Sequence, residues 1–222
     1  MAVDEQAYKV VGTRPIRHDG VDKVTGRAKY GVDASMPGMV WGKVLRSPHA
    51  RARILSINTA RAEAADGILA VTTGADYPDT GPGDYMDERA IARNRVTYEG
   101  QAVAAIAAAN AHDAEEALRL IEVEYETLPP ILDVQSAMEQ DAPIILEELR
   151  TETSGSFGNS PTNIAKHIIH EEGDVEAGMA AADHVFERSY TTSMVHQGYI
   201  EPHNALAYWN PDGSLVVESS SQ

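Results

Sequence analysis

One short stretch near the end of the chain carries side chains that could do chemistry. It reads VHQGYIEPHNALAYW, from Val195 to Trp209, and it places Glu201 between apolar Ile200 and helix-breaking Pro202. Because the following run ALAYW reads as buried, the carboxylate would lose part of its water, and that loss is costly unless a donor or a ligand compensates for it. We therefore expect Glu201 either to be paired within the fold or to bind something.

The neighbours of Glu201 allow further interpretations. Gln197 could face the same pocket, although a glutamine beside a glycine is more often a loop residue that makes hydrogen bonds. Tyr199 is typical of a packed aromatic residue with its hydroxyl satisfied. His196, Glu201 and His203 together would offer imidazole and carboxylate ligands to zinc or iron. Their spacing matches no standard metal motif, so this interpretation is the weaker one.

Two other groups of polar side chains could also suggest a site. Asp84 to Glu88, with Asp87 between them, could be paired carboxylates for acid and base catalysis, but a solvated loop explains them more simply in a chain this acidic. His167 and His170 lie three positions apart in an expected strand. Strand geometry sends them to opposite faces, so they could not share an ion.

Composition restricts the class of protein. The 222 residues are 43% hydrophobic and 23% charged, as in a soluble globular protein with one sizeable core or two small ones. The formal charge of -16 would repel a phosphate backbone, so we expect no nucleic-acid partner. No apolar run reaches the length of a membrane span, and MAVDEQAYKV lacks the pattern of a signal peptide. We expect a cytoplasmic protein.

The sequence contains no cysteine. Disulfides, thiolate nucleophiles and cysteine-ligated iron–sulfur clusters are therefore excluded from this chain. Any such redox centre would lie on another polypeptide.

The first half of the sequence predicts a compact mixed α/β unit. Residues 1–37 are too rich in glycine and proline for a helix and predict an extended arm with turns. The elements expected next are two strands within 39–57 broken at Ser47-Pro48, a short capped helix at 58–65, a buried strand at 68–74 and a loop at 80–87. They are followed by strand candidates at 95–100 and 102–109, of which the second is ambiguous because it is rich in alanine. A helix at 110–121 and a half-exposed strand at 121–127 complete the unit.

The second half is less regular. Residues 139–163 show no clean periodicity and predict a linker. The elements expected beyond it are a strand at 163–174, a helix capped by Asp174 with Val175, Met179 and Ala182 facing inward, a strand at 184–193, and a hairpin of HNALAYW and SLVVESSSQ around the turn at 210–213. One short helix could not cover this sheet, so the second unit is expected to be incomplete.

The order of several motifs resembles a known family. The segments are DKVTGRAKYGVDASMPGMVWGKVLRSPHARARILSI and its continuation to Asp76, RVTYEGQAVAAIAA, the helix AEEAL, and IEVEYETLPPILDVQSAM. From about Val11 to Gln222 the chain resembles the N-terminal part of the molybdenum-binding large subunit of the xanthine dehydrogenase and aldehyde oxidase family. Each motif is weak alone, and their order and spacing make the resemblance specific.

The resemblance implies an α+β (mixed α/β) fold. An extended arm would occupy residues 1–24, an α/β-hammerhead domain 25–138, a linker 139–163, and the beginning of the first molybdenum-cofactor-binding domain 164–222. Two family elements are not found, a Gly-Gly-Gly-Phe-Gly-type loop and a segment with the general-base glutamate. We therefore expect a fragment or split piece of the large subunit that is inactive alone.

The family's chemistry is oxidation of an aldehyde or N-heteroaromatic substrate with oxygen from water. The resemblance implies molybdenum–molybdopterin bound mainly by residues outside this chain, with iron–sulfur clusters and FAD on partner subunits. The expected partners are the remainder of the large subunit, an iron–sulfur subunit, an FAD subunit and the small-molecule substrate. The alternative is a non-catalytic scaffold that binds partner subunits through its hammerhead domain and C-terminal edge strand.

The resemblance also implies roles for individual residues. It places the segment of Glu201 in the substrate pocket, with Gln197 and Tyr199 as further substrate-binding candidates. The alternative for Glu201 is that it accepts local backbone hydrogen bonds and orients the following strand. Gly100 and Gln101 would lie near the cofactor, although a tight turn explains them more simply. No catalytic residue and no metal ligand is expected in this chain.

Overall fold

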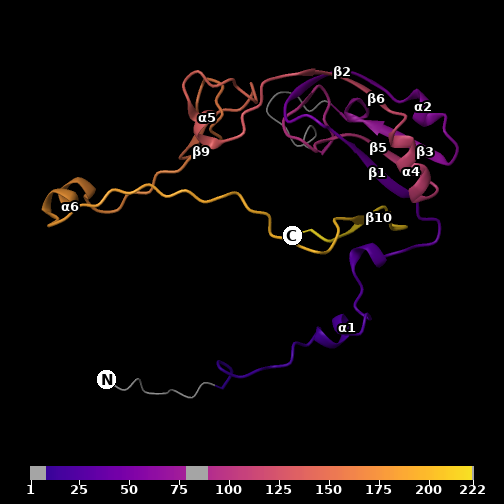
Figure 1. The fold of residues 1–222 in the computed structure, drawn as a ribbon, viewed down its shortest axis with the longest axis horizontal. Helices are drawn as coiled ribbons and strands as arrows, with labels where there is room; N and C mark the ends of the chain where they lie inside the picture. Colours follow the sequence, from indigo (N-terminus) through magenta and orange to yellow (C-terminus); the bar gives the residue numbers. More distant parts are fainter. Residues whose placement is uncertain (1–8, 79–89, 222) are drawn as a thin grey trace. The chain divides into compact units, whose positions relative to one another are not determined.

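A computed structural model describes residues 9–78 and 90–221 (Figure 1). The chain forms two compact units, and each is described by itself. Residues 39–188 form the sheet unit. Residues 1–38 together with 189–222 form the terminal unit. The loop predicted at 80–87 and the acidic group of Asp84, Asp87 and Glu88 lie outside the described residues.

A three-stranded antiparallel sheet is the centre of the sheet unit (Figure 1). Its order is β1 (Trp41–Arg46), β5 (Ala102–Ala108) and β3 (Ile68–Thr73). The alanine-rich run that was ambiguous in the sequence is thus the central strand β5. Its alternate residues Ala104, Ile106 and Ala108 are buried, and their side chains are short enough for a helix to approach the sheet.

The covering helix is α4 (Ala111–Leu118), close to the predicted range 110–121. It begins where the side chain of Asn110 accepts a hydrogen bond of 2.9 Å from the backbone N–H of Asp113. Ala114 and Ala117 are buried and pack against the buried residues of β5. The predicted helix is confirmed, with bounds shorter than expected.

A second sheet has the order β4 (Arg95–Val96), β2 (Ala52–Asn58) and β6 (Glu122–Thr127). The chain moves from the first sheet to the second at Ser47-Pro48, and the predicted break between β1 and β2 is confirmed. The short helix α2 (Ala60–Glu63) follows β2, also as predicted. The exposed face of β6 carries the expected glutamates, of which Glu126 pairs with Arg53 at 2.7 Å.

Two strand predictions for this unit need correction. β3 is not fully buried: Ile68 and Val71 pack partly against the core, but Leu69, at a register shift, is 61% exposed. The strand expected at 95–100 is limited to the two residues of β4. Gly100 has a φ of +86°, which belongs to a turn and ends the extended segment.

The rest of the sheet unit contains short elements. They are α5 (Val134–Met138), β7 (Glu152–Thr153), β8 (Ser156–Phe157), β9 (Lys166–His167) and α6 (Val175–Ala181). β7 pairs with β8 and with β9, so part of the predicted linker contains a small sheet. The side chain of Asp174 caps α6 as expected, by accepting the N–H of Ala177 at 2.9 Å.

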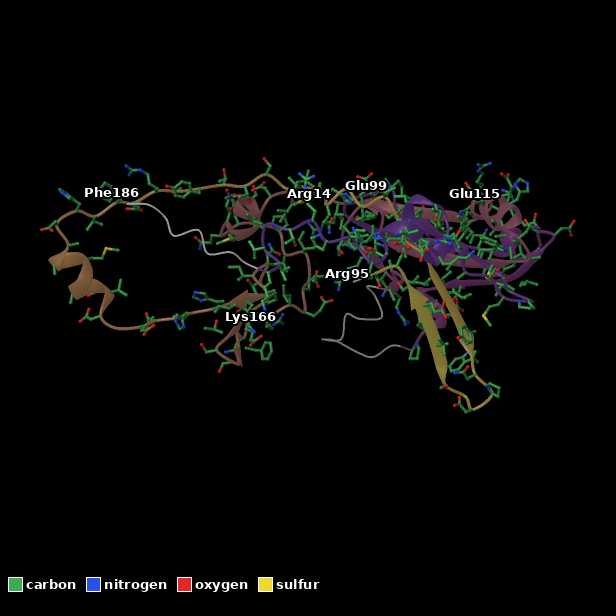
Figure 2. All side chains as sticks on the ribbon, turned by 90° about the horizontal axis from the view of Figure 1, so that it is seen from below. Arg14, Arg95, Glu99, Glu115, Lys166 and Phe186 are labelled. Carbon is green, nitrogen blue, oxygen red and sulfur yellow. The ribbon has the colours of Figure 1, made fainter. Side chains whose placement is uncertain are left out.

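The two strands and the inward-facing helix residues expected after residue 163 do not form a buried unit in the described chain. The strand expected at 163–174 is reduced to β9, and no strand forms at 184–193. Val175 and Met179 are 60% and 56% exposed although their spacing gives α6 an apolar face. Figure 2 shows Phe186 on the irregular stretch after α6, where its side chain is 77% exposed. Among the described residues, these apolar side chains do not belong to a buried core.

The terminal unit is built from the predicted hairpin and the arm. β10 (Ala205–Trp209) pairs antiparallel with β11 (Leu215–Ser219) through a turn in which Gly213 has a φ of +85°. The run ALAYW is less buried than predicted, with Trp209 71% exposed. The arm is not wholly extended, because it forms the five-residue helix α1 (Gly20–Val24) and the 3-10 turn η1 (Gly31–Asp33).

A pair of cations stabilises the start of α1. The hydrogen bond from Arg17, together with a further contact from Lys23, holds the pKa of the Asp19 carboxyl well below its usual range. None of the helices in the described ranges is long and apolar enough to cross a membrane. The four domain ranges expected from the sequence stay a prediction.

Ile106→Ala should lower the free energy of unfolding by about 2–5 kcal/mol, because Ile106 is 2% exposed and its loss leaves a cavity between β5 and α4. The matched control is Leu69→Ala on the same sheet, which should cost less than about 0.5 kcal/mol because Leu69 is exposed. Urea unfolding of the chain followed by circular dichroism measures both. Equal losses in the two variants would contradict this description of the core.

Candidate functional site

Glu201 is held by a hydrogen bond inside the terminal unit. It lies on the irregular segment that leads into β10, and it is half-buried while its neighbours are exposed. The backbone N–H of Gly31 donates to Oε1 of Glu201 at 3.2 Å, across 170 positions of sequence. Within the described residues this is the only hydrogen bond of the carboxylate. One of its oxygens is therefore satisfied by backbone, and the other has no hydrogen-bond donor among the described residues.

The 3-10 turn η1 makes the N–H of Gly31 available. The first N–H groups of any helical turn lack partners within the turn. Asp33 accepts one of them, from Tyr30 at 3.0 Å. The N–H of Gly31 is the next along the chain, and Glu201 supplies its acceptor.

Asn204 packs directly against Gly31. A Cβ atom on residue 31 would lie 2.3 Å from Oδ1 of Asn204, so only glycine fits without a shift. The backbone of Asn204 is fixed to the end of β11, because its N–H donates to Oγ of Ser220 at 3.3 Å. Ser220 in turn donates to the carbonyl of Pro202 at 3.1 Å. Residues 202–204 are thus fixed on one side by β11 and on the other by η1.

Two imidazoles flank Tyr199. Its ring lies 4.7 Å from that of His196 and 4.6 Å from that of His203, the second contact being edge-to-face. The backbone N–H of Gly198 donates to Nδ1 of His196 at 3.0 Å, which fixes the orientation of that ring. Tyr199 is nevertheless 49% exposed, so it is less packed than expected.

The remaining candidates of this segment are not drawn into a cluster. Gln197 is exposed and makes no hydrogen bond within the described residues. No three side chains of histidine, aspartate or glutamate in the described part of the chain come together as metal ligands. The weaker interpretation of His196, Glu201 and His203 as a metal site therefore has no geometric support.

Gly100 and Gln101 form a tight corner in the sheet unit. Gln101 is 3% exposed, and its Oε1 accepts the backbone N–H of Thr97 at 2.8 Å. The backbone of both residues is tied to Ser47, with distances of 2.9 Å and 2.8 Å. The guanidinium of Arg46 donates to the carbonyl of Gly100 at 2.8 Å. These contacts support the turn interpretation, and the cofactor role of this pair stays a prediction.

Ser47 also organises the bend between β1 and β2. Its hydroxyl donates to the carbonyl of His49 and accepts the N–H of the same residue, both at 3.0 Å. The ring of His49 packs edge-on against Tyr125 at 4.9 Å. Burial raises the pKa of Tyr125, and a hydrogen bond with Ser47 only partly offsets it. His49 thus takes part in the bend through its backbone, while its ring packs against an aromatic residue.

A cavity of about 230 Å³ lies beside β2 and β4. Three arginines line it, but each is already engaged. Arg51 donates to the carbonyls of Pro129 and Ile144 at 3.0 Å and 2.9 Å. Arg53 pairs with Glu126, and Arg95, labelled in Figure 2, pairs with Glu148. Arg51 and Arg95 therefore hold the chain that follows β6 in place, and Arg53 links β2 to β6. The three are not arranged as an anion site.

Sequence reasoning identified Glu201 but missed both residues that fix it. Gly31 sits in an arm with many glycines, and Asn204 sits in a hairpin where asparagine is common. No periodicity links positions so far apart. The only signal available was the unusual place of a carboxylate next to Pro202, which predicts a partner without saying which one.

Two family models match the chain in succession. Residues 25–129 match the a/b hammerhead domain of aldehyde oxidase and xanthine dehydrogenase. Residues 157–222 match the molybdopterin cofactor-binding domain. The chain belongs to the xanthine dehydrogenase and aldehyde oxidase family. Its fold class, a mixed α/β hammerhead followed by the start of a molybdopterin-binding domain, agrees with the expectation from the sequence.

Similar proteins match almost the whole length of this chain. The chain is 35% identical over 93% of its length to one probable subunit of a xanthine dehydrogenase from Bacillus subtilis, of which it covers 26%. It is 33% identical over 97% of its length to the nicotinate dehydrogenase large molybdopterin subunit of Eubacterium barkeri, of which it covers 48%. The solved CO dehydrogenase of Oligotropha carboxidovorans is similar with a TM-score of 0.75 and 28% identity, over 94% of this chain and 27% of that one. The chain thus spans between about a quarter and a half of these relatives.

Gln101→Ala should lower the free energy of unfolding of the chain by about 1–3 kcal/mol, because the buried N–H of Thr97 loses its acceptor. Gln197→Ala is the matched control and should change it by less than about 0.5 kcal/mol, since Gln197 is exposed. Urea unfolding in the absence of any cofactor measures both. An unchanged stability of Gln101→Ala would argue against the turn role.

Proposed function

We propose that this chain is part of the molybdenum-containing large subunit of a multi-subunit hydroxylase or dehydrogenase. The enzyme would oxidise an aldehyde or N-heteroaromatic substrate with water as the oxygen source, and electrons would pass to iron–sulfur and flavin centres on partner subunits. The observation that carries the proposal is the hammerhead domain followed by a molybdopterin cofactor-binding domain in one chain. Relatives that are large subunits of xanthine, nicotinate and carbon monoxide dehydrogenases support it.

The described residues do not supply a ligand set for the metal. No cluster of three metal-ligating side chains forms among them. From the family resemblance we propose that the molybdopterin is held mainly by polypeptide outside these 222 residues. The role proposed for this chain is to form one wall of the substrate pocket. Glu201 would contribute to it with the carboxylate oxygen that Gly31 does not occupy. Gln197 and Tyr199, on the same segment, are the proposed neighbours of the substrate.

Exposed apolar side chains support burial of this chain against further polypeptide. Ile168 and Phe186 are both 77% exposed, and Met194 and Ile200 are 98% and 96% exposed. A soluble protein rarely leaves so many large apolar side chains in water, and such surfaces mark contacts with other protein. The remainder of the large subunit is the partner proposed for them. The iron–sulfur and FAD subunits would join the assembly through surfaces of the complete protein.

The function is tested on the complete large subunit purified with its partner subunits. The preparation should contain molybdenum, iron and flavin, and it should oxidise an aldehyde or N-heteroaromatic compound with an artificial electron acceptor. In water labelled with oxygen-18, the label should enter the product. A single partner without metals, or a product whose new oxygen comes from molecular oxygen, would contradict the proposal.

Glu201→Gln in this complete enzyme should lower kcat/KM by about tenfold or more, because the charge that meets the substrate is lost. Its melting temperature should stay unchanged, because an amide oxygen can still accept the N–H of Gly31. Steady-state kinetics and thermal unfolding separate the two effects. An unchanged kcat/KM with a lower melting temperature would favour a purely structural role for Glu201.

A further inference from the structure

We infer that Gly31 and Asn204 are positioning residues for Glu201, so that the arm before the hammerhead domain forms part of the site. This inference rests on the proposed function of Glu201 and goes beyond it by assigning the group that fixes the carboxylate. Three observations within the terminal unit carry it. They are the hydrogen bond from Gly31, the close packing of Asn204 on Gly31, and the attachment of residues 202–204 to β11.

The hydrogen bond determines which way the carboxylate points. A glutamate side chain has several rotatable bonds and would sample many orientations on an irregular segment. The N–H of Gly31 binds only Oε1, and a donor to a carboxylate makes one of the stronger hydrogen bonds in a protein. The bond therefore selects one orientation and leaves Oε2 without a hydrogen-bond donor among the described residues. A group that must meet a substrate gains from being fixed before the substrate arrives.

Asn204 determines where Gly31 lies. The missing side chain at position 31 leaves space for the amide of Asn204, and an added Cβ would come within 2.3 Å of its Oδ1. Nδ2 of Asn204 is buried and makes no hydrogen bond within the described residues, so its amide is held there by packing and by the backbone contacts with Ser220. A larger residue at 31 would have to push η1 away from residues 201–204. The hydrogen bond to Glu201 would then lengthen or break.

The hydrogen bond between Gly31 and Glu201 links two parts of the chain that are far apart in sequence. Gly31 precedes β1, and Glu201 follows the whole sheet unit. Through this contact, the position of the arm determines the position of a side chain in the cofactor-binding domain. A change in the arm should therefore alter catalysis without touching the substrate.

The test uses the complete enzyme with its partner subunits and compares Gly31→Ala with Gly20→Ala. Both replace a glycine of the arm by alanine, but a Cβ at position 20 meets only Cβ of Arg17 at an ordinary 3.5 Å. Gly31→Ala should lower kcat/KM by about tenfold at an unchanged molybdenum content, the loss expected for one misplaced hydrogen bond of about 1.4 kcal/mol. Gly20→Ala should behave as the wild type.

Two further variants distinguish positioning from general damage. Asn204→Ala alone should also lower kcat/KM at an unchanged molybdenum content, because Gly31 loses the side chain that packs against it. In a Glu201→Ala background, Gly31→Ala should cause no additional loss, because a residue that acts through Glu201 has nothing left to position. Additive losses, or equal kinetics of Gly31→Ala and Gly20→Ala, would overturn the inference.

Hydrogen exchange of the Gly31 amide tests the contact without relying on activity. The amide should be protected in the wild type and in Glu201→Gln, and it should exchange at least about tenfold faster in Glu201→Ala, where the acceptor is absent. Equal exchange in all three would overturn the inference even in a fully active enzyme. A different outcome is also distinguishable: the Gly31 amide is protected as expected, but the complex shows no molybdenum-dependent turnover. That result would refute the proposed function and the catalytic part of the inference. The contact between Gly31 and Glu201 would still be established.

Discussion

A half-buried carboxylate requires a donor, and in this chain the donor comes from the opposite end of the sequence. Glu201 accepts the N–H of Gly31, and that requirement determines how the arm, the irregular segment before β10 and the end of β11 are arranged in the terminal unit. Burial of a carboxylate without such a bond would cost more than the contact itself contributes. The contacts among these three segments therefore follow from the half-buried position of the Glu201 carboxylate.

The sheet unit depends on a different constraint, the small size of its central residues. β5 consists almost entirely of alanine, and α4 turns alanines toward it, so that strand and helix approach closely with Ile106 as the largest side chain between them. The Arg53–Glu126 pair links β2 to β6 within the second sheet. The Arg95–Glu148 pair and the backbone contacts of Arg51 then fasten the following chain to that sheet. A rigid support of this kind is what a pocket wall needs, because side chains on a mobile scaffold cannot hold a fixed geometry.

The sequence predicted the elements whose pattern is local. The helix at 110–121, the alternating strand at 121–127, the break at Ser47-Pro48 and the final hairpin were all expected, because periodicity, a capping residue or a proline marks each of them. The strands at 163–174 and 184–193 were expected and are almost absent. Their side chains alternate as in strands, but a strand needs a neighbouring strand, and this chain provides only the two residues of β9 with a partner.

The candidate site was predictable only in part, for the same reason. An acidic residue between Ile200 and Pro202 indicates that a partner must exist, and composition indicates that any cysteine-bound redox centre lies outside these 222 residues. Neither says that Gly31 is the partner, because its role depends on a tertiary contact and on an absent side chain. The family resemblance identified the correct fold class and family, whereas the roles of Glu201, Gln197 and Tyr199 still rest on the proposed function.

The most direct test is to locate the metal relative to Glu201 in crystals of the complete enzyme. Anomalous scattering at the molybdenum edge would mark its position without assumptions about the cofactor. The account predicts a metal on the side of the carboxylate where Oε2 is free, with the hydrogen bond from Gly31 intact. A molybdenum site separated from Glu201 by the β10–β11 hairpin, or a Glu201 turned away from Gly31 toward solvent, would contradict it.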